Sequence, residues 1–181
     1  MRRYPNLKTI AFIGNYLPRK CGIATFTKDL LNAVSTEAPQ LECWALAMND
    51  IIQGYPYPSQ VHFELNSKRL ADYKLAAEFL NVNKVDIVCL QHEFGIYGGE
   101  YGSYILTLLK NLRMPIVTTL HTLLPNPNLK QKEIINTIVK ISDRIIVMSQ
   151  KAEMFLKDIY KVPKEKIVVN GLKKNSMSKE W

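Results

Sequence analysis

Residues Val85-Asp-Ile-Val-Cys-Leu90 form a short, mostly apolar run, and Gln91-His92-Glu93-Phe94-Gly95 follows it directly. Short runs rich in β-branched residues are typical of strands that are buried on both faces of a parallel sheet. The run therefore predicts a central strand. Its polar carboxyl end leads into a glycine-rich turn through Gly98, Gly99 and Gly102.

Strand-like and helix-like segments alternate on both sides of this run. We expect further strands at 8–14, 41–48, 61–65, 116–120, 144–148 and 165–169, and helices at 22–37, 68–80, 101–112, 128–141 and 150–160. Parallel strands joined by helical crossovers are the natural solution for such an alternation. Residues 1–169 are thus predicted to form a single α/β, doubly wound, Rossmann-like domain with a mostly parallel sheet of about seven strands and helices on both faces. Residues 170–181 lack periodicity and are expected to be a frayed tail.

The composition fits one domain in the cytoplasm. The chain has 181 residues, of which 47% are hydrophobic, so a full core can be buried. No apolar run approaches the roughly 18 residues that span a bilayer. The run at 9–13 is also too short for the apolar region of a signal peptide. We expect a cytoplasmic protein that is at most peripheral at a membrane.

The net charge of +8 is concentrated at the two ends of the chain. Residues 1–10 and 161–181 hold nine of the 24 Lys and Arg residues and only two of the 16 acidic ones. Nucleic-acid-binding folds usually carry a basic stripe on their folded part, so no nucleic-acid partner is expected. The basic ends are either solvated termini or weak contacts for a membrane surface with anionic lipid, and the sequence leaves both alternatives open.

Several familiar motifs are missing. The three cysteines, Cys21, Cys43 and Cys89, include no CxxC pair, so no metal site of the common zinc spacing is expected. The segment from Gly14 to Gly22 lacks G-x-G-x-x-G, and no P-loop occurs in the sequence.

Ligands of open parallel sheets bind beyond the carboxyl ends of the strands, near the point where the strand order reverses. This rule selects three segments, here called the rim: Asn15 to Ile23, His92 to Gly99, and His121 with Thr122. A histidine that closes a strand is either a structural hydrogen-bonding group or a site residue that bonds sugar hydroxyls. Glycines in the rim either let the backbone approach a phosphate or sugar or form tight turns. Both alternatives stay open.

Four blocks of the sequence resemble, in the correct order, the signatures of the large group 1, or mannosyltransferase-like, family of retaining glycosyltransferases. They are Ile13 to Thr27, Gln91 to Gly99, Val117 to Thr122 and Ser142 to Ser149. The match runs from about residue 8 to 169.

The resemblance implies the GT-B architecture, in which two Rossmann-like domains face each other across a cleft. The N-terminal domain mainly binds the sugar acceptor, the C-terminal domain grips the nucleotide sugar that serves as donor, and no metal is required. By position, Gly22 and Ile23 would lie near the donor phosphates and acceptor. His92, Glu93 and Phe94 would line the cleft, and His121, the catalytic candidate, would reach the transferred sugar. The remaining candidates for substrate binding are Gly98, Gly99 and Thr122.

The sequence departs from the family pattern after Val169. The family continues with a proline-histidine-glycine turn, a linker and a second domain, whereas here Asn170-Gly171 follows and ten residues remain. The family's pair of donor-binding glutamates is missing too. We therefore expect a truncated, acceptor-side domain of a hexosyltransferase that is inactive alone and binds no cofactor by itself. The alternatives are an interaction module that pairs with a separate donor-binding subunit, and a stand-alone nucleotide-binding protein.

Overall fold

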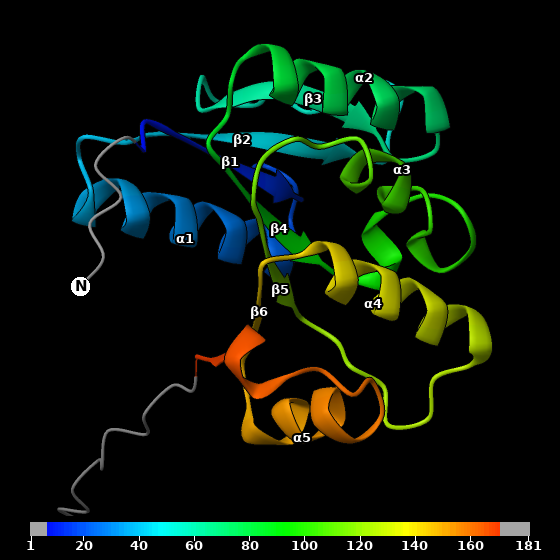
Figure 1. The fold of residues 1–181 in the computed structure, drawn as a ribbon. Coiled ribbons are helices and arrows are strands. Elements are labelled where there is room, and N and C mark those ends of the chain that lie inside the picture. The colour runs from blue at the N-terminus through cyan, green and yellow to red at the C-terminus, as the bar shows by residue number, and fades with distance from the viewer. Residues whose placement is uncertain (1–6, 171–181) are drawn as a thin grey trace, which may run out of the picture.

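The computed structural model describes residues 7–170, in which seven strands and five α-helices alternate along the chain (Figure 1). The strands are β1 (Thr9–Gly14), β2 (Glu42–Asn49), β3 (Val61–Asn66), β4 (Ile87–His92), β5 (Ile116–Leu120), β6 (Arg144–Val147) and β7 (Ile167–Val169). The helices are α1 (Gly22–Glu37), α2 (Leu70–Val82), α3 (Ile105–Leu109), α4 (Leu129–Ile141) and α5 (Gln150–Asp158). Short 3-10 turns lie at Phe94–Ile96, Glu100–Gly102 and Lys164–Lys166. The tail expected at 170–181 lies, apart from its first residue, outside the described residues.

All seven strands form one parallel sheet in the order β3-β2-β1-β4-β5-β6-β7. This confirms the predicted doubly wound α/β fold, and every strand pair within residues 7–170 is parallel. The strand order reverses between β1 and β4, so the connections that follow these two strands diverge. The first two segments of the rim start at this switch point.

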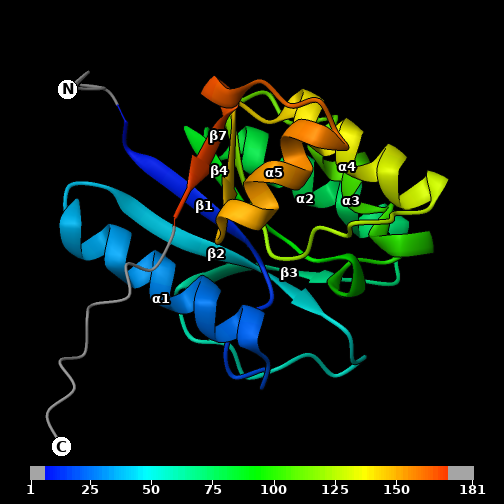
Figure 2. The ribbon, with the colours of Figure 1, turned by 90° about the horizontal axis from the view of Figure 1, so that it is seen from below.

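Helix α1 covers one face of the sheet, and α2, α3, α4 and α5 cover the other (Figures 1 and 2). The right-handed rule for crossovers explains this division, because the chain crosses the sheet in one direction from β1 to β2 and in the opposite direction from β3 to β7. Alternate side chains of a strand point to opposite faces. Phe12 therefore packs on the α1 face, whereas Ile13 packs on the four-helix face.

The predicted helix over 101–112 is wrong at both ends. The structure has a 3-10 turn over Glu100–Gly102 and then a helix of only five residues, α3. Tyr101 and Gly102 have φ angles of 50° and 77°, which lie in the left-handed region and interrupt a right-handed helix. The strand predicted at 165–169 is likewise shorter, because Lys164–Lys166 forms a 3-10 turn.

Asp86, directly before β4, joins the start of the central strand to the start of β1. Its carboxylate accepts hydrogen bonds from the backbone amides of Lys8 at 2.7 Å and Thr9 at 2.9 Å. The strand itself begins at Ile87, two residues after the predicted Val85.

Replacing Asp86 by Ala is expected to lower the free energy of unfolding by about 1–3 kcal/mol, because two backbone donors lose a charged acceptor. Urea denaturation of the variant and the wild type measures the difference. Asp29→Ala is the matched control, since Asp29 is an exposed carboxylate on α1, and it is expected to shift stability by less than about 0.5 kcal/mol. Equal losses in the two variants would show that the Asp86 bonds do not stabilise the fold.

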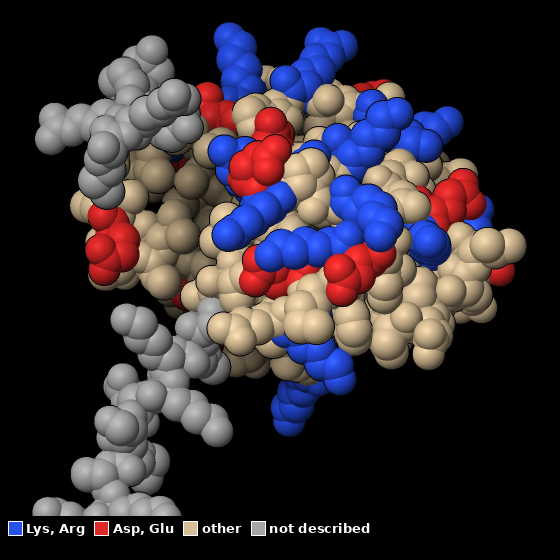
Figure 3. Space-filling model, turned by 60° about the horizontal axis from the view of Figure 1, so that its bottom comes forward, with Lys and Arg blue, Asp and Glu red and all other residues tan. Residues whose placement is uncertain are grey.

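Charge on the described surface is mixed. Residues 129–170 carry nine basic and five acidic side chains, whereas residues 7–128 carry ten of each. Figure 3 shows acidic side chains interspersed among the basic ones on the face that it draws, and Lys130–Glu133 and Lys157–Glu153 are ion pairs. Within residues 7–170, no helix has the length and apolar character needed to cross a membrane.

Candidate functional site at the carboxyl edge of the sheet

The three segments of the rim meet at the carboxyl ends of β1, β4 and β5. The backbone amide of His121 donates to the carbonyl of His92 at 3.0 Å, which ties the second segment to the third. Helix α1, which follows the first segment, reaches the third through Phe26. The Phe26 ring meets the His121 ring edge to face, with centroids 4.9 Å apart and an interplanar angle of 87°. The sequence rule therefore selected segments that do lie together.

His121 lies on the α1 face and is partly buried. Its Nε2 atom is 3.1 Å from Oε1 of Gln91, a side chain that is only 1% exposed. Burial lowers the pKa of His121 from its ordinary 6.5, and the nearby Glu93 carboxylate opposes this shift. At neutral pH the ring is therefore uncharged, and it suits hydrogen bonding to a neutral group better than pairing with an anion.

His92 closes β4 at the same rim but points to the four-helix face. Its ring is fully buried, edge to face with Phe94 at 5.2 Å and stacked with Tyr97 at 6.0 Å. The sheet register causes this difference, because His92 pairs with Leu120 and the next residue, His121, must face the other way. The resemblance placed His92 along the cleft with Glu93 and Phe94, whereas in this structure the ring of His92 has no exposed surface and lies beneath the rim. Ligand contact by His92 stays a prediction.

Glu93, Phe94 and Thr122 form a small network between the second and third segments of the rim. The Thr122 hydroxyl donates to one carboxylate oxygen of Glu93, and the amide of Phe94 donates to the other at 2.9 Å. Glu93 thereby caps the 3-10 turn over Phe94–Ile96. This network gives Glu93 and Thr122 a structural role, whereas ligand contact by either residue stays a prediction.

The glycines of the rim differ in their surroundings. A Cβ atom added at Gly98 would lie 1.9 Å from the backbone oxygen of Ser67, and one at Gly99, where φ is 79°, would lie 2.5 Å from the Tyr104 ring. Close packing and a positive φ thus explain these two glycines. A Cβ added at Gly22 would meet nothing within 4 Å. Gly22 therefore faces open space, as the functional alternative requires.

The N-terminus of α1 offers two free backbone donors to that space. The first amides of an α-helix have no acceptor within the helix. The thiol of Cys21 accepts from the amide of Ala24 at 3.4 Å, which leaves the amides of Gly22 and Ile23 without an acceptor among residues 7–170. Two such amides at the positive end of a helix dipole are suited to an anion.

Sequence reasoning missed a polar network beside α1. The Arg19 guanidinium donates to Oδ1 of Asn15 at 3.0 Å and pairs with Asp50 at 3.0 Å, and the Tyr55 hydroxyl donates to Asp50 at 3.0 Å. Sequence reasoning also did not single out Gln91, whose side chain hydrogen-bonds the His121 ring. Their positions at strand ends were the available signal, but the sequence did not show which of those side chains point inward.

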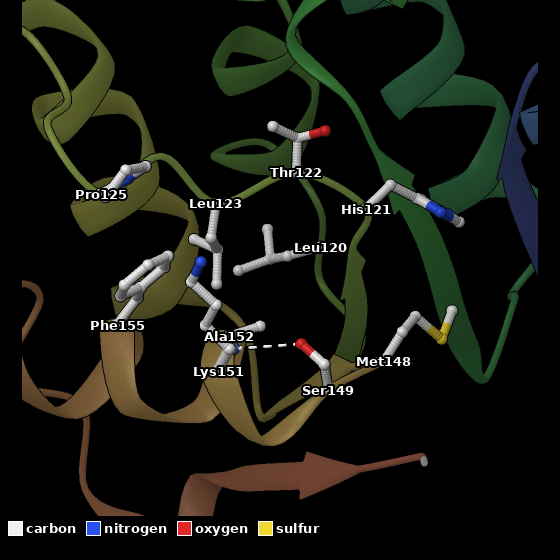
Figure 4. A pocket seen from close by; sticks show the side chains of 10 residues that line it. All are labelled: Leu120, His121, Thr122, Leu123, Pro125, Met148, Ser149, Lys151, Ala152 and Phe155. Carbon is white, nitrogen blue, oxygen red and sulfur yellow. Dashed lines mark hydrogen bonds between the residues drawn. The ribbon is translucent and has the colours of Figure 1, made fainter. Parts of the chain in front are cut away.

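A pocket of about 340 Å³ lies at the third segment, between the end of β5 and the start of α5 (Figure 4). It is lined by Leu120, His121, Thr122, Leu123, Pro125, Met148, Ser149, Lys151, Ala152 and Phe155. Ser149 caps α5 by accepting from the amide of Ala152 at 3.2 Å, and the His121 side chain extends away from Pro125 and Phe155. His121 therefore lies at the end of the pocket opposite Pro125 and Phe155. In residues 7–170, no group of three or more His, Cys, Asp or Glu side chains is placed to hold a metal ion.

The fold and the rim define a Rossmann-like α/β domain with a candidate ligand site at its switch point. The family model described as Glycosyltransferase Family 4 matches residues 22–170, a range that holds every candidate site residue. The chain belongs to glycosyltransferase family 4. This confirms the resemblance seen in the four sequence blocks. No curated protein matches the sequence.

Two solved structures share the fold. A glycosyltransferase from Rickettsia africae ESF-5 gives a TM-score of 0.59 at 20% identity, over 92% of this chain and 43% of that chain. Sucrose-phosphate synthase from Thermosynechococcus elongatus gives 0.56 at 13% identity, over 93% and 91%. At these identities the likeness shows the fold alone. This chain spans less than half the length of the Rickettsia chain.

Proposed function

We propose that this domain is the acceptor-side half of a glycosyltransferase that transfers a sugar from a nucleotide sugar to a carbohydrate or lipid-linked acceptor. The observation that carries the proposal is the meeting of two unlike groups at the switch point. One is the N-terminus of α1, with the free amides of Gly22 and Ile23. The other is the uncharged His121 ring, held against the same helix by Phe26.

These two groups match the two ends of a nucleotide sugar. Its diphosphate is an anion that suits the backbone donors and dipole of a helix N-terminus. Its sugar carries hydroxyl groups that suit a neutral imidazole, which can donate or accept. Negative charge grows on the leaving phosphate as the glycosidic bond breaks, and fixed donors that stabilise this charge lower the barrier.

The domain supplies only one wall of such a site. Two backbone amides stabilise the diphosphate weakly when water still competes for it, and transfer requires interactions that strengthen in the transition state. We therefore propose that the domain works with a separate donor-binding domain or subunit and transfers little or no sugar alone. Added to the isolated chain, uridine or guanosine diphosphate is expected to bind with a Kd of about 1 mM, near −4 kcal/mol.

Gly22→Pro is the sharpest test of the diphosphate site. Proline is well tolerated at the first position of a helix, and Cys21 before it has the extended backbone, φ −156° and ψ 157°, that a following proline needs. The variant removes one amide donor but not the helix. We expect the diphosphate Kd to rise about tenfold, the loss of one hydrogen bond to a charged group.

Titration of ¹⁵N-labelled protein with uridine diphosphate, followed by amide chemical shifts, measures this change. Gly22→Ala keeps the amide and meets open space, so it serves as the control with unchanged affinity. Equal affinities of Gly22→Pro and wild type would place the diphosphate elsewhere. Micromolar binding of nucleotide by the isolated chain would favour a stand-alone nucleotide-binding protein instead.

A further inference from the structure

Gln91 is the one side chain that hydrogen-bonds the His121 ring within residues 7–170. It lies on β4 with its side chain on the α1 face, and its Cβ atom would be 3.0 Å from a Cβ added at Gly14. Gln91 thus packs against β1, and the residue is only 1% exposed. Its oxygen meets His121 Nε2 at 3.1 Å, while its nitrogen has no partner.

The bond from Gln91 fixes the proton on the His121 ring. In the orientation of the Gln91 amide seen here the oxygen faces Nε2; an amide oxygen can only accept a hydrogen bond, so this orientation requires the proton on Nε2 and leaves Nδ1 of the neutral ring as a lone-pair acceptor. Phe26 packs edge to face against the same ring at 4.9 Å, and a turn of the ring by 180° would move Nε2 away from the Gln91 oxygen. No protein donor reaches Nδ1 among the described residues.

We propose that Gln91 is a positioning residue that holds His121 in the Nε2–H tautomer, so that Nδ1 accepts a hydrogen bond from a hydroxyl group of the bound sugar. The role as a sugar contact rests on the proposed function, but the tautomer does not. The unpaired amide nitrogen supports a role beyond stability. A buried donor without a partner costs about 1–3 kcal/mol, so an apolar side chain of similar length would serve the core as well.

The experiment reads the tautomer directly. Long-range ¹H–¹⁵N correlation spectra of the labelled protein distinguish Nε2–H, Nδ1–H and doubly protonated rings, and His121→Asn assigns the His121 pattern among the three histidines. Spectra are recorded above the ordinary histidine pKa of about 6.5. We expect the Nε2–H pattern in the wild type. An Nδ1–H pattern would overturn the proposal, because Gln91 would then present its nitrogen to the ring.

Two variants separate positioning from packing. Gln91→Met keeps the length of the side chain but removes the acceptor, and it is expected to give a mixture of tautomers at unchanged or slightly higher stability. Gln91→Glu keeps an acceptor oxygen, so it should retain the Nε2–H tautomer and raise the pKa of His121 by about one pH unit or more through the added negative charge. Retention of the wild-type pattern in Gln91→Met would overturn the proposal.

The proposed function fails separately from this inference. The diphosphate titration could show no binding at Gly22 while the His121 tautomer still changes in Gln91→Met. Gln91 would then position the His121 ring, but the contact of Nδ1 with a sugar hydroxyl would lose its support. If a variant does not fold, an Nδ1–H pattern in the wild-type spectrum still overturns the proposal.

Discussion

Gly98→Ala is expected to lower the free energy of unfolding by about 3 kcal/mol, at the upper end of the cost of overpacking a filled site. The added Cβ atom would lie 1.9 Å from the backbone oxygen of Ser67 and 2.8 Å from the Tyr104 ring. A backbone oxygen cannot rotate aside as a flexible side chain can. It is also held in place, because the Tyr73 hydroxyl donates to it at 2.9 Å while accepting from the Gly98 amide at 2.9 Å.

Gly95→Ala is the matched control for this prediction. Gly95 lies three residues earlier on the same rim segment, and a Cβ added there would meet nothing within 4 Å. Its effect is expected to stay within about 0.5 kcal/mol. Urea denaturation of the two variants and the wild type measures both values. Similar midpoints for the two variants would show that the rim segment can shift away from Ser67 at little cost.

The fold could be predicted because its signals are local. Strands such as β5 are buried apolar runs, and α1 begins at a glycine and carries apolar side chains at helical spacing, so the predicted bounds 116–120 and 22–37 agree with the structure. The prediction failed at Tyr101, whose φ of 50° is unusual for an aromatic residue. The glycines before it pack closely against Ser67 and Tyr104, and such tertiary contacts are not visible in a local stretch of sequence.

The candidate site could be predicted in position but not in orientation. Strand ends identified the rim, and its three segments do meet. Whether His92 and His121 share a face of the sheet depends on the register of β4 against β5. The pairing of His92 with Leu120 is set by the tertiary structure and is not visible in the local sequence. A shift by one residue would exchange the faces of every side chain on the strand. Gln91 was overlooked for the same reason, because its partner is 30 residues away.

The burial of His92 predicts a strong dependence of stability on pH. Burial lowers the pKa of His92 from 6.5 to about 3, and the nearby His121 adds to this shift. Between these two pH values the His92 ring is protonated in the unfolded chain but not in the folded protein. The free energy of unfolding therefore falls as the pH falls below about 6.5. The slope approaches about 1.4 kcal/mol per pH unit for one proton. Below the folded pKa this loss is complete.

Protonation of carboxylates also lowers the stability of the fold in acid. The variant His92→Phe separates the contribution of His92 from theirs. A phenyl ring retains the shape that packs against Phe94 and Tyr97 but does not titrate. Both ring nitrogens of His92 lack a partner, so at pH 7 the variant is expected to be as stable as the wild type or more stable. Urea midpoints measured from pH 7 down to about pH 4 should diverge, with the variant falling less steeply. Parallel curves would mean that the ring is hydrated in solution, and His92 would then lie open at the rim, where a ligand could reach it.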